Sequence, residues 1–319
     1  MNKLAQEVGN ITHKSVLLKE SIEYLRPIED GVYIDATLGL GSHTRHLLES
    51  TNLRSRVIGF DVDEEAITIA KDRLSEFKDN VHFMNRNFYE IDSISSELKL
   101  TEVDGIIADL GMSSYQLEHS NRGFSFMRNE PLDMRMDAKL QFTAYDLVNE
   151  MSFEELSKLL WDYGEESFSK KIARSIIKSR EQKPLQTSKE LAALISNSIP
   201  RKFHPKRIHP ATKTFQALRI AVNNELENLR VFIEKAVKLL KAGGRLVIIS
   251  FHSLEDRIVK NYFKNLHSSC ICPPDLPICR CEKESTVKII TRSPVTAGEE
   301  EMLENPRARS SKMRVVERI

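Results

Sequence analysis

Four short apolar runs in the first third of the chain predict the strands of a parallel sheet. They occupy residues 32–35, 56–61, 81–84 and 105–109. Stretches of helical periodicity separate them, the clearest at residues 64–74. Strands that alternate with helices of about ten residues are typical of βαβ units. We therefore expect an α/β domain, preceded by a helix that begins at an N-cap, Ser15, and ends before Pro27.

The alternation of predicted strands and helices ends after Asp109. Residues 111–140 show no clear period, and helices without strands follow them. Ser152 and Thr187, each with a Glu three positions later, are typical of capping boxes. This stretch therefore predicts an all-helical insertion.

Helices and strands alternate again after residue 210. An amphipathic helix is expected to end at Gly243 and Gly244, and a strand follows over residues 245–251. Two further apolar runs, 287–291 and 313–319, predict an edge hairpin. The predicted organisation is a first part of the α/β domain, an inserted helical domain and a second part of the α/β domain, over residues 1–114, 115–210 and 211–319.

A glycine-containing turn joins the first predicted strand to the helix after it. Residues 35–44 read DATLGLGSHT, and glycines in such a turn let the backbone approach a ligand while the helix start offers unpaired N–H groups. Asp61 ends the second strand, where nucleotide-binding α/β folds place a carboxylate for ribose hydroxyls. A plain tight turn beside an exposed carboxylate is the simpler alternative. The coupling of strand, turn, helix, strand and acid favours a bound adenine nucleoside.

The third position of the glycine pattern decides between two kinds of cofactor. A dinucleotide fingerprint needs glycine there, and this chain has Thr44. The order D-x-x-x-G-x-G from Asp35, followed by residues 59–61, resembles the first two motifs of S-adenosylmethionine-dependent methyltransferases. S-adenosylmethionine carries no pyrophosphate, so the third glycine is dispensable. A nicotinamide-dependent oxidoreductase stays as an alternative.

Longer motifs carry a more specific resemblance. They read NRGFSFMR, PLDMRMD, HPATKTFQALR, ISFHSLEDR and ENPRARSS, at residues 121–128, 131–137, 209–219, 249–257 and 304–311. Together they resemble the bacterial ribosomal RNA small subunit methyltransferase H family, also called MraW. The resemblance implies a Rossmann-like methyltransferase sheet whose helical insertion recognises the substrate. It also implies methylation, by S-adenosyl-L-methionine, of the N4 amine of one cytidine in the decoding region of 16S ribosomal RNA.

The same resemblance implies the residues of the site. The expected cofactor contacts are Gly41, Ser42, His43, Asp61, Phe88, Asp109 and Gln116. Asp109 is the expected catalytic residue, because its carboxylate or the Leu110 carbonyl would accept from the target amine and stabilise developing positive charge. Ser42 stands where the family has glycine, so its φ must suit a side chain. This intact set of acids and glycines disfavours a third hypothesis, a non-catalytic RNA-binding protein with the same fold.

Two groups of rings have alternative roles. Tyr115, Phe124 and Phe126 are candidates to stack on the target base, or they pack within the loop. His252, at the end of a later strand, would orient substrate or act as a base, or it is a hydrogen-bonded structural histidine. It is left out of the catalytic assignment.

The four cysteines fall within one short stretch, at positions 270, 272, 279 and 281. A disulfide framework is not expected in a cytoplasmic protein. Two pairs of thiolates suit a tetrahedral zinc, although C-x-C is a less usual arm than a longer spacing. Structural zinc and bare thiols both stay open, and no catalytic metal is predicted.

Charge and hydropathy bear on location and partners. No apolar run approaches the roughly 20 residues that span a bilayer, and no secretory signal is visible, so we expect a cytoplasmic protein without a membrane partner. The net charge is only +1, but residues 201–219 hold six Lys and Arg and no acid, and residues 307–318 hold five and one acid. These stretches are candidates to bind 16S ribosomal RNA in the small ribosomal subunit, with solvated basic faces as the alternative. No DNA partner is expected, and the oligomeric state stays open.

Overall fold

The protein divides into two compact units, a sheet unit of residues 1–111 and 226–319 and a helical unit of residues 112–225. The structure, a computed structural model, describes residues 15–319 except 114–115, 118–119, 207, 271 and 273–280. Within this part of the chain, no helix is long and apolar enough to cross a membrane.

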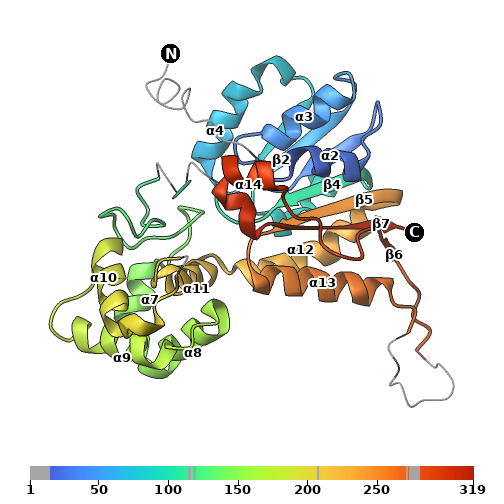
Figure 1. Ribbon diagram of the computed structural model, residues 1–319. Helices are drawn as coiled ribbons and strands as arrows, with labels where there is room; N and C mark the ends of the chain where they lie inside the picture. The colour runs from blue at the N-terminus through green and yellow to red at the C-terminus, as the bar shows by residue number, and fades with distance from the viewer. Residues whose placement is uncertain (1–14, 114–115, 118–119, 207, 271, 273–280) are drawn as a thin grey trace. The chain divides into compact units, whose positions relative to one another are not determined.

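The sheet unit contains a mixed seven-stranded sheet in the order β3-β2-β1-β4-β5-β7-β6 (Figure 1). The strands are β1 (Val32–Asp35), β2 (Arg56–Asp61), β3 (Val81–Asn85), β4 (Val103–Asp109), β5 (Leu240–Ser250), β6 (Val287–Ile289) and β7 (Lys312–Arg318). The first five strands of the order are parallel, and β7 runs antiparallel to both β5 and β6. The chain leaves β1 toward β2 and β3 and then returns to place β4 on the other side of β1. This reversal is the switch point at which open α/β sheets bind ligands.

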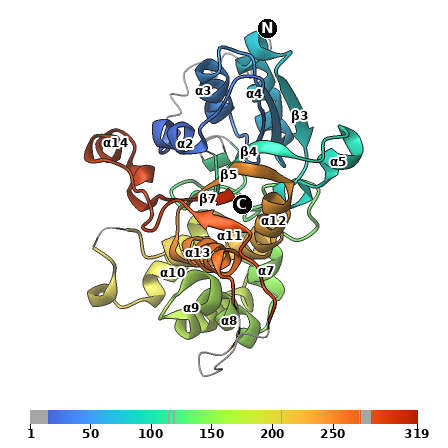
Figure 2. The ribbon, with the colours of Figure 1, turned by 90° about the vertical axis from the view of Figure 1, so that its right-hand side faces the viewer.

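Helices cover both faces of the sheet (Figures 1 and 2). One face carries α2 (Leu18–Leu25), α3 (Ser42–Ser50) and α4 (Glu64–Arg73), and the other carries α5 (Ser93–Glu97), α12 (Glu225–Leu239) and α13 (Ser253–His267). Alternate residues of β1 divide between the two faces: Ile34 packs with α12, whereas Tyr33 packs with α2 and α3. Both faces are apolar because both are covered. Short helical segments complete the unit: α14 (Glu299–Glu304) and the 3-10 helices η1 (Ser75–Phe77), η2 (Phe88–Glu90) and η4 (Pro306–Ser310).

The structure confirms the predicted α/β class, the strands of the sheet and the antiparallel pair at its edge, but it corrects two helix ends. The N-cap of α2 is Leu17, in a left-handed conformation, and not Ser15. Helix α12 ends at Leu239 rather than at Gly243, because Leu240 already pairs with Val103 in the sheet. Pairing with the neighbouring strand therefore overrides the glycine stop signal.

The helical unit has its own apolar core. It contains α7 (Ala144–Glu150), α8 (Phe153–Gly164), α9 (Ser169–Arg180), α10 (Ser188–Ser198), η3 (Arg201–Phe203) and α11 (Thr212–Asn223). Ser152 and Thr187 form the capping boxes predicted for them, with Glu155 and Glu190. The unit includes α11, which the sequence pattern assigns to the second part of the α/β domain.

Candidate functional site

Three aspartates end three adjacent strands of the sheet. Asp35 is the last residue of β1, Asp61 of β2 and Asp109 of β4. Because β2, β1 and β4 are parallel neighbours, their carboxyl ends meet at one edge, at the switch point of the sheet. The candidate site is therefore this edge of the sheet. It holds three carboxylates, and no Lys or Arg of the described residues bonds to any of them.

The turn that follows β1 is tied to the strands on both sides. The amide of Ala36 donates to the carbonyl of Ile107 in β4 (2.8 Å), and the amide of Leu38 donates to the carbonyl of Phe60 in β2 (2.8 Å). The Asp109 amide in turn donates to the hydroxyl of Thr37 (2.6 Å). The turn is thus held across the sheet edge before any ligand arrives, which is the preorganisation that a binding loop needs.

Gly41 is the residue on which the shape of the turn depends. Its φ is 81°, and a Cβ placed there would lie 2.6 Å from Cδ1 of Leu74. The left-handed φ disfavours any larger residue, and a side chain there would require Leu74 to move. Ser42 begins α3 and is not among the residues with positive φ, so the family's glycine is not required at this position. The start of α3 presents backbone N–H groups that have no partner within the helix.

Asp61 is held by backbone donors and is partly exposed. Its Oδ2 accepts from the amide of Gly39 (2.8 Å) and its Oδ1 from the amide of Asp63 (2.9 Å). Burial raises the pKa of Asp61 to about 6 against these hydrogen bonds, and the charges of Asp63 and Asp35 add to the rise. A carboxylate has about four acceptor positions, so each oxygen keeps capacity for a hydroxyl donor.

Asp35 is buried beneath the turn. It accepts from the hydroxyl of Thr44 (2.8 Å) and the amide of Thr37 (3.3 Å). Burial raises its pKa to about 6, although these hydrogen bonds oppose the rise. Asp35 therefore supports the turn and the start of α3 from below.

Asp109 differs from the other two aspartates. Its Oδ1 is buried and accepts no hydrogen bond from the described residues, although the residue as a whole is partly exposed. Burial raises the pKa of Asp109 well above its usual value, and the charges of Asp35, Glu255 and Glu301 raise it further. A buried acceptor without a donor costs about 1–3 kcal/mol. Such a group is typical of a site that a ligand completes.

A cavity of about 540 Å³ adjoins the turn in the sheet unit. Its walls come from the turn and α3 on one side and from α2 and α14 on the other, including Leu40, Gly41, Ser42, Arg45, Lys19 and Glu301. Glu301 also accepts from the amide of Leu17 (2.7 Å), which links α14 to the start of α2. A cavity of this size can enclose part of a nucleoside-sized ligand.

The remaining predicted cofactor residues have different surroundings. His43, in the first turn of α3, is buried. Phe88 lies in η2 after β3, and its ring meets Phe232 edge to face at 5.1 Å. Gln116 belongs to the helical unit, where it is buried and its Oε1 accepts from the amide of Ser113 (3.2 Å). Of the seven predicted residues, six thus lie in the sheet unit, and Gln116 lies in the other.

Two of the three rings proposed to stack on the target base already pack against other residues of the helical unit. Phe124 is buried in the core of the helical unit. Phe126 stacks on His209, with centroids 4.6 Å apart. Tyr115 lies outside the described residues. His252 is the N-cap of α13, and its Nδ1 accepts from the amide of Glu255 (3.4 Å), as in the structural alternative stated for it. Its Nε2 is buried 3.1 Å from Oε1 of Glu255 and has no hydrogen bond from the described residues.

Two contributors to the site, Thr37 and Glu301, are not among the residues predicted from the sequence. Thr37 ties the turn to Asp109, and a threonine two positions after a strand-ending aspartate is a recognisable local signal for such a turn. Glu301 affects the charge around Asp109 from a helix near the end of the chain. No local pattern in the sequence places it there.

The two basic stretches are used differently. Arg201, Lys202 and Lys206 are exposed on the helical unit. In the second stretch, Lys312 and Arg314 pair with Asp256 of α13 at 3.1 and 2.6 Å. Part of the second stretch therefore supports the sheet, whereas the exposed cations of the first are available to a polyanion.

Comparisons with known proteins agree with the sequence resemblance. The MraW methylase family model matches residues 10–319. The Ribosomal RNA small subunit methyltransferase H of Clostridioides difficile (strain 630) is 50% identical over 307 residues, 96% of this chain and 99% of that protein. The protein of the same name from Halothermothrix orenii is 49% identical over 309 residues, 97% of this chain and 99% of that protein. A SAM-dependent O-methyltransferase structure from Thermotoga maritima has a TM-score of only 0.41 at 11% identity, covering 100% of this chain and 72% of that one, and supports no conclusion.

Proposed function

The chain belongs to the MraW methylase family, and from this premise we propose that it methylates 16S ribosomal RNA of the small subunit with S-adenosylmethionine as methyl donor. We propose further that the acceptor is the N4 amine of one cytidine in the decoding region. A ribosomal substrate implies that the enzyme acts in the cytoplasm. The observation that carries the proposal is the buried Oδ1 of Asp109, which has no hydrogen-bond partner among the described residues, beside a preorganised glycine turn.

The residues of the sheet edge fit this cofactor. Asp61 would accept from the ribose hydroxyls, and the N–H groups of Ser42 and His43 at the start of α3 would receive an anionic group. The N–H of Gly41 already donates to the carbonyl of Leu38 (2.8 Å), so Gly41 would contribute by letting the ligand approach the backbone. Phe88 offers an apolar surface for the adenine. Thr44 in place of a third glycine disfavours a dinucleotide, and therefore an oxidoreductase.

Asp109 would act on the acceptor amine. When bound, S-adenosylmethionine supplies a methyl group on a positively charged sulfur. The lone pair of the cytosine N4 is delocalised into the ring, so an acceptor on its N–H bond localises the lone pair and stabilises the positive charge that develops. The raised pKa of Asp109 makes it a stronger base than an exposed aspartate, which suits it to hold or take that proton.

The helical unit would provide part of the RNA contact. Arg201, Lys202 and Lys206 are exposed cations, and the exposed ring of Phe203 lies beneath the ammonium of Lys202 at 4.9 Å. Cations beside an aromatic ring suit a single-stranded nucleic acid. Contacts of this kind weaken steeply as salt is added. Neutralising the three cations should therefore reduce both the affinity for the subunit and its dependence on salt.

Labelled S-adenosylmethionine and small ribosomal subunits that lack the modification test the proposal. We expect nucleoside analysis to find labelled N4-methylcytidine, and Asp109→Ala to abolish it. Asp162→Asn is a matched control, because it removes an exposed carboxylate from α8 and should leave the label unchanged. Label at another nucleoside would contradict the proposed acceptor. Absence of cofactor binding by calorimetry would contradict the whole proposal.

A further inference from the structure

Three cysteines gather in the loop between α13 and β6 of the sheet unit. The sulfur atoms of Cys270, Cys272 and Cys281 all lie within 4.8 Å of one another. The Sγ atoms of Cys270 and Cys281 are 3.9 Å apart. A disulfide holds its sulfurs at about 2.05 Å, so this pair is not bridged. The proposed methyl transfer uses none of the three.

The base of this loop is held closed by the end of α13 and the start of β6. The amide of Thr286 donates to the carbonyl of Leu266 (3.0 Å), and a ring nitrogen of His267 bonds with the carbonyl of Val287 (3.0 Å). The Lys283 ammonium donates to Oδ1 of Asn265 (2.7 Å). These bonds bring the two arms of the loop together, so cysteines 11 residues apart in sequence can share one centre.

One hydrogen bond to sulfur favours the thiolate form in the first arm, and two bonds to Ser268 hold the backbone beside it. The amide of Cys272 donates to Sγ of Cys270 (3.3 Å). The amide of Cys270 donates to the hydroxyl of Ser268 (3.2 Å), which in turn donates to the Cys270 carbonyl (2.5 Å). A donor directed at sulfur stabilises its charged form, and the thiolate is the form that binds metals.

We propose that Cys270, Cys272 and Cys281 bind one zinc ion as thiolates. Tetrahedral zinc with Zn–S bonds of about 2.3 Å separates its sulfurs by about 3.8 Å, close to the 3.9 Å between Cys270 and Cys281. Soft sulfur ligands select zinc over magnesium or calcium. Three thiolates leave one tetrahedral position for a water or a further side chain; Cys279 lies outside the described residues. The ion would act as a structural clip that fixes the two arms.

The full-length protein, purified under reducing conditions without chelator, tests the site by elemental analysis. We expect about one zinc per chain, and less than about a tenth of that in Cys270→Ser and Cys281→Ser. Ser269→Ala changes an exposed neighbour that carries no sulfur and should keep the full zinc content. Replacement by cobalt should produce thiolate charge-transfer and tetrahedral d–d absorption, and both bands should be lost in the cysteine variants.

Three results would overturn the proposal. One is a chain without zinc that also takes up no cobalt, another is zinc that persists in the cysteine variants, and the third is the visible spectrum of an iron–sulfur cluster. If a serine variant fails to fold by far-UV circular dichroism, mercurial titration of the unmodified protein replaces it. That titration must release one zinc per chain as the thiols react, and titration without release would equally contradict the site.

Discussion

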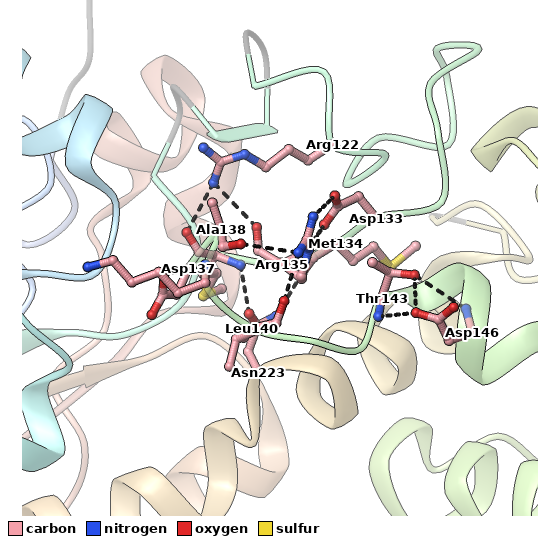
Figure 3. Close-up of polar contacts among 12 residues, drawn as sticks. Arg122, Asp133, Met134, Arg135, Asp137, Ala138, Leu140, Thr143, Asp146 and Asn223 are labelled. Atoms are coloured by element: carbon pink, nitrogen blue, oxygen red, sulfur yellow. Dashed lines mark hydrogen bonds and ion pairs between the residues drawn. The ribbon is translucent and has the colours of Figure 1, made fainter.

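The sheet edge and the loop before α7 both concentrate charged side chains, yet the two regions balance charge in opposite ways. At the sheet edge, none of the described residues places a Lys or Arg on Asp35, Asp61 or Asp109, and burial raises the pKa of each. In the loop of the helical unit, Asp133 and Arg135 form a bidentate pair at 2.7 and 2.8 Å (Figure 3). Burial alone would raise the pKa of Asp133, but the hydrogen bonds and charge of Arg135 hold it below its usual value.

The loop uses its polar groups to fix the backbone. Arg135 also donates to the carbonyl of Leu140 (2.7 Å), and Asn223 bonds to both neighbours of Arg135, to the carbonyl of Met134 (2.8 Å) and the amide of Met136 (2.7 Å) (Figure 3). Met134 is held at a φ of 60° within this network. Satisfied charges therefore stabilise a loop that has no regular structure. Charges without counterions cost stability, and their retention at the sheet edge favours a functional role there.

The largest expected effect separates activity from stability at Asp109. Asp109→Asn should lower kcat for methyl transfer by about 10²–10³-fold, because the amide is a far weaker acceptor for the developing charge. The same change should raise the free energy of unfolding at pH 8 by about 1 kcal/mol, because it removes a buried charge without a donor. Single-turnover assays and urea denaturation test both parts. If Asp109→Asn lost stability along with activity, the Asp109 carboxylate would stabilise the fold just as Asp133 does, which would contradict this prediction.

The same substitution in the loop should have the opposite effect on stability. Asp133→Asn breaks the bidentate pair with Arg135 and leaves its guanidinium partly unpaired, which should lower the free energy of unfolding by about 2 kcal/mol. Trp161 is the one tryptophan of the chain and lies in α8, so its fluorescence reports unfolding of the helical unit. Asp162→Asn, in an exposed pair with Lys158, is the control and should leave the free energy of unfolding almost unchanged.

The pH dependence of stability should also reveal the unpaired charge at the sheet edge. With a pKa of about 6 when folded against about 3.9 when unfolded, Asp35 binds its proton more tightly in the folded state. Its contribution to stability is therefore present below about pH 4 and is lost as the pH rises through about 6. The stability of Asp35→Asn relative to the unmodified protein should therefore rise by about 2 kcal/mol from pH 4 to pH 7. Calorimetry at matched pH values measures this difference, and a constant offset would contradict it.

The contrast between the two regions also shows how far the sequence alone can predict such a site. Apolar runs identify the strands, and the residues that end them are Asp35, Asp61 and Asp109, so the edge was predictable from local pattern. What a carboxylate meets there depends on the register between strands and on distant segments. The pairing of Arg314 with Asp256 follows from β7 lying beside β5, and no local signal indicates it. A basic stretch in the sequence is therefore a weaker guide to RNA contact than the exposed cations of the folded chain.

A smaller effect is expected at Asp61, and it tests whether the absence of a donor, rather than charge alone, distinguishes Asp109. Both aspartates end a strand at the same edge and both have a raised pKa. However, both oxygens of Asp61 accept from backbone amides, so in Asp61→Asn one amide N–H would have to face the side-chain NH₂. We expect this variant to lose about 1 kcal/mol of stability and to bind S-adenosylmethionine about tenfold more weakly. Urea denaturation measures the change in the free energy of unfolding for Asp61→Asn and Asp109→Asn. Changes of opposite sign would show that hydrogen bonding determines how much each buried charge destabilises the protein. Equal signs would show instead that burial alone does so.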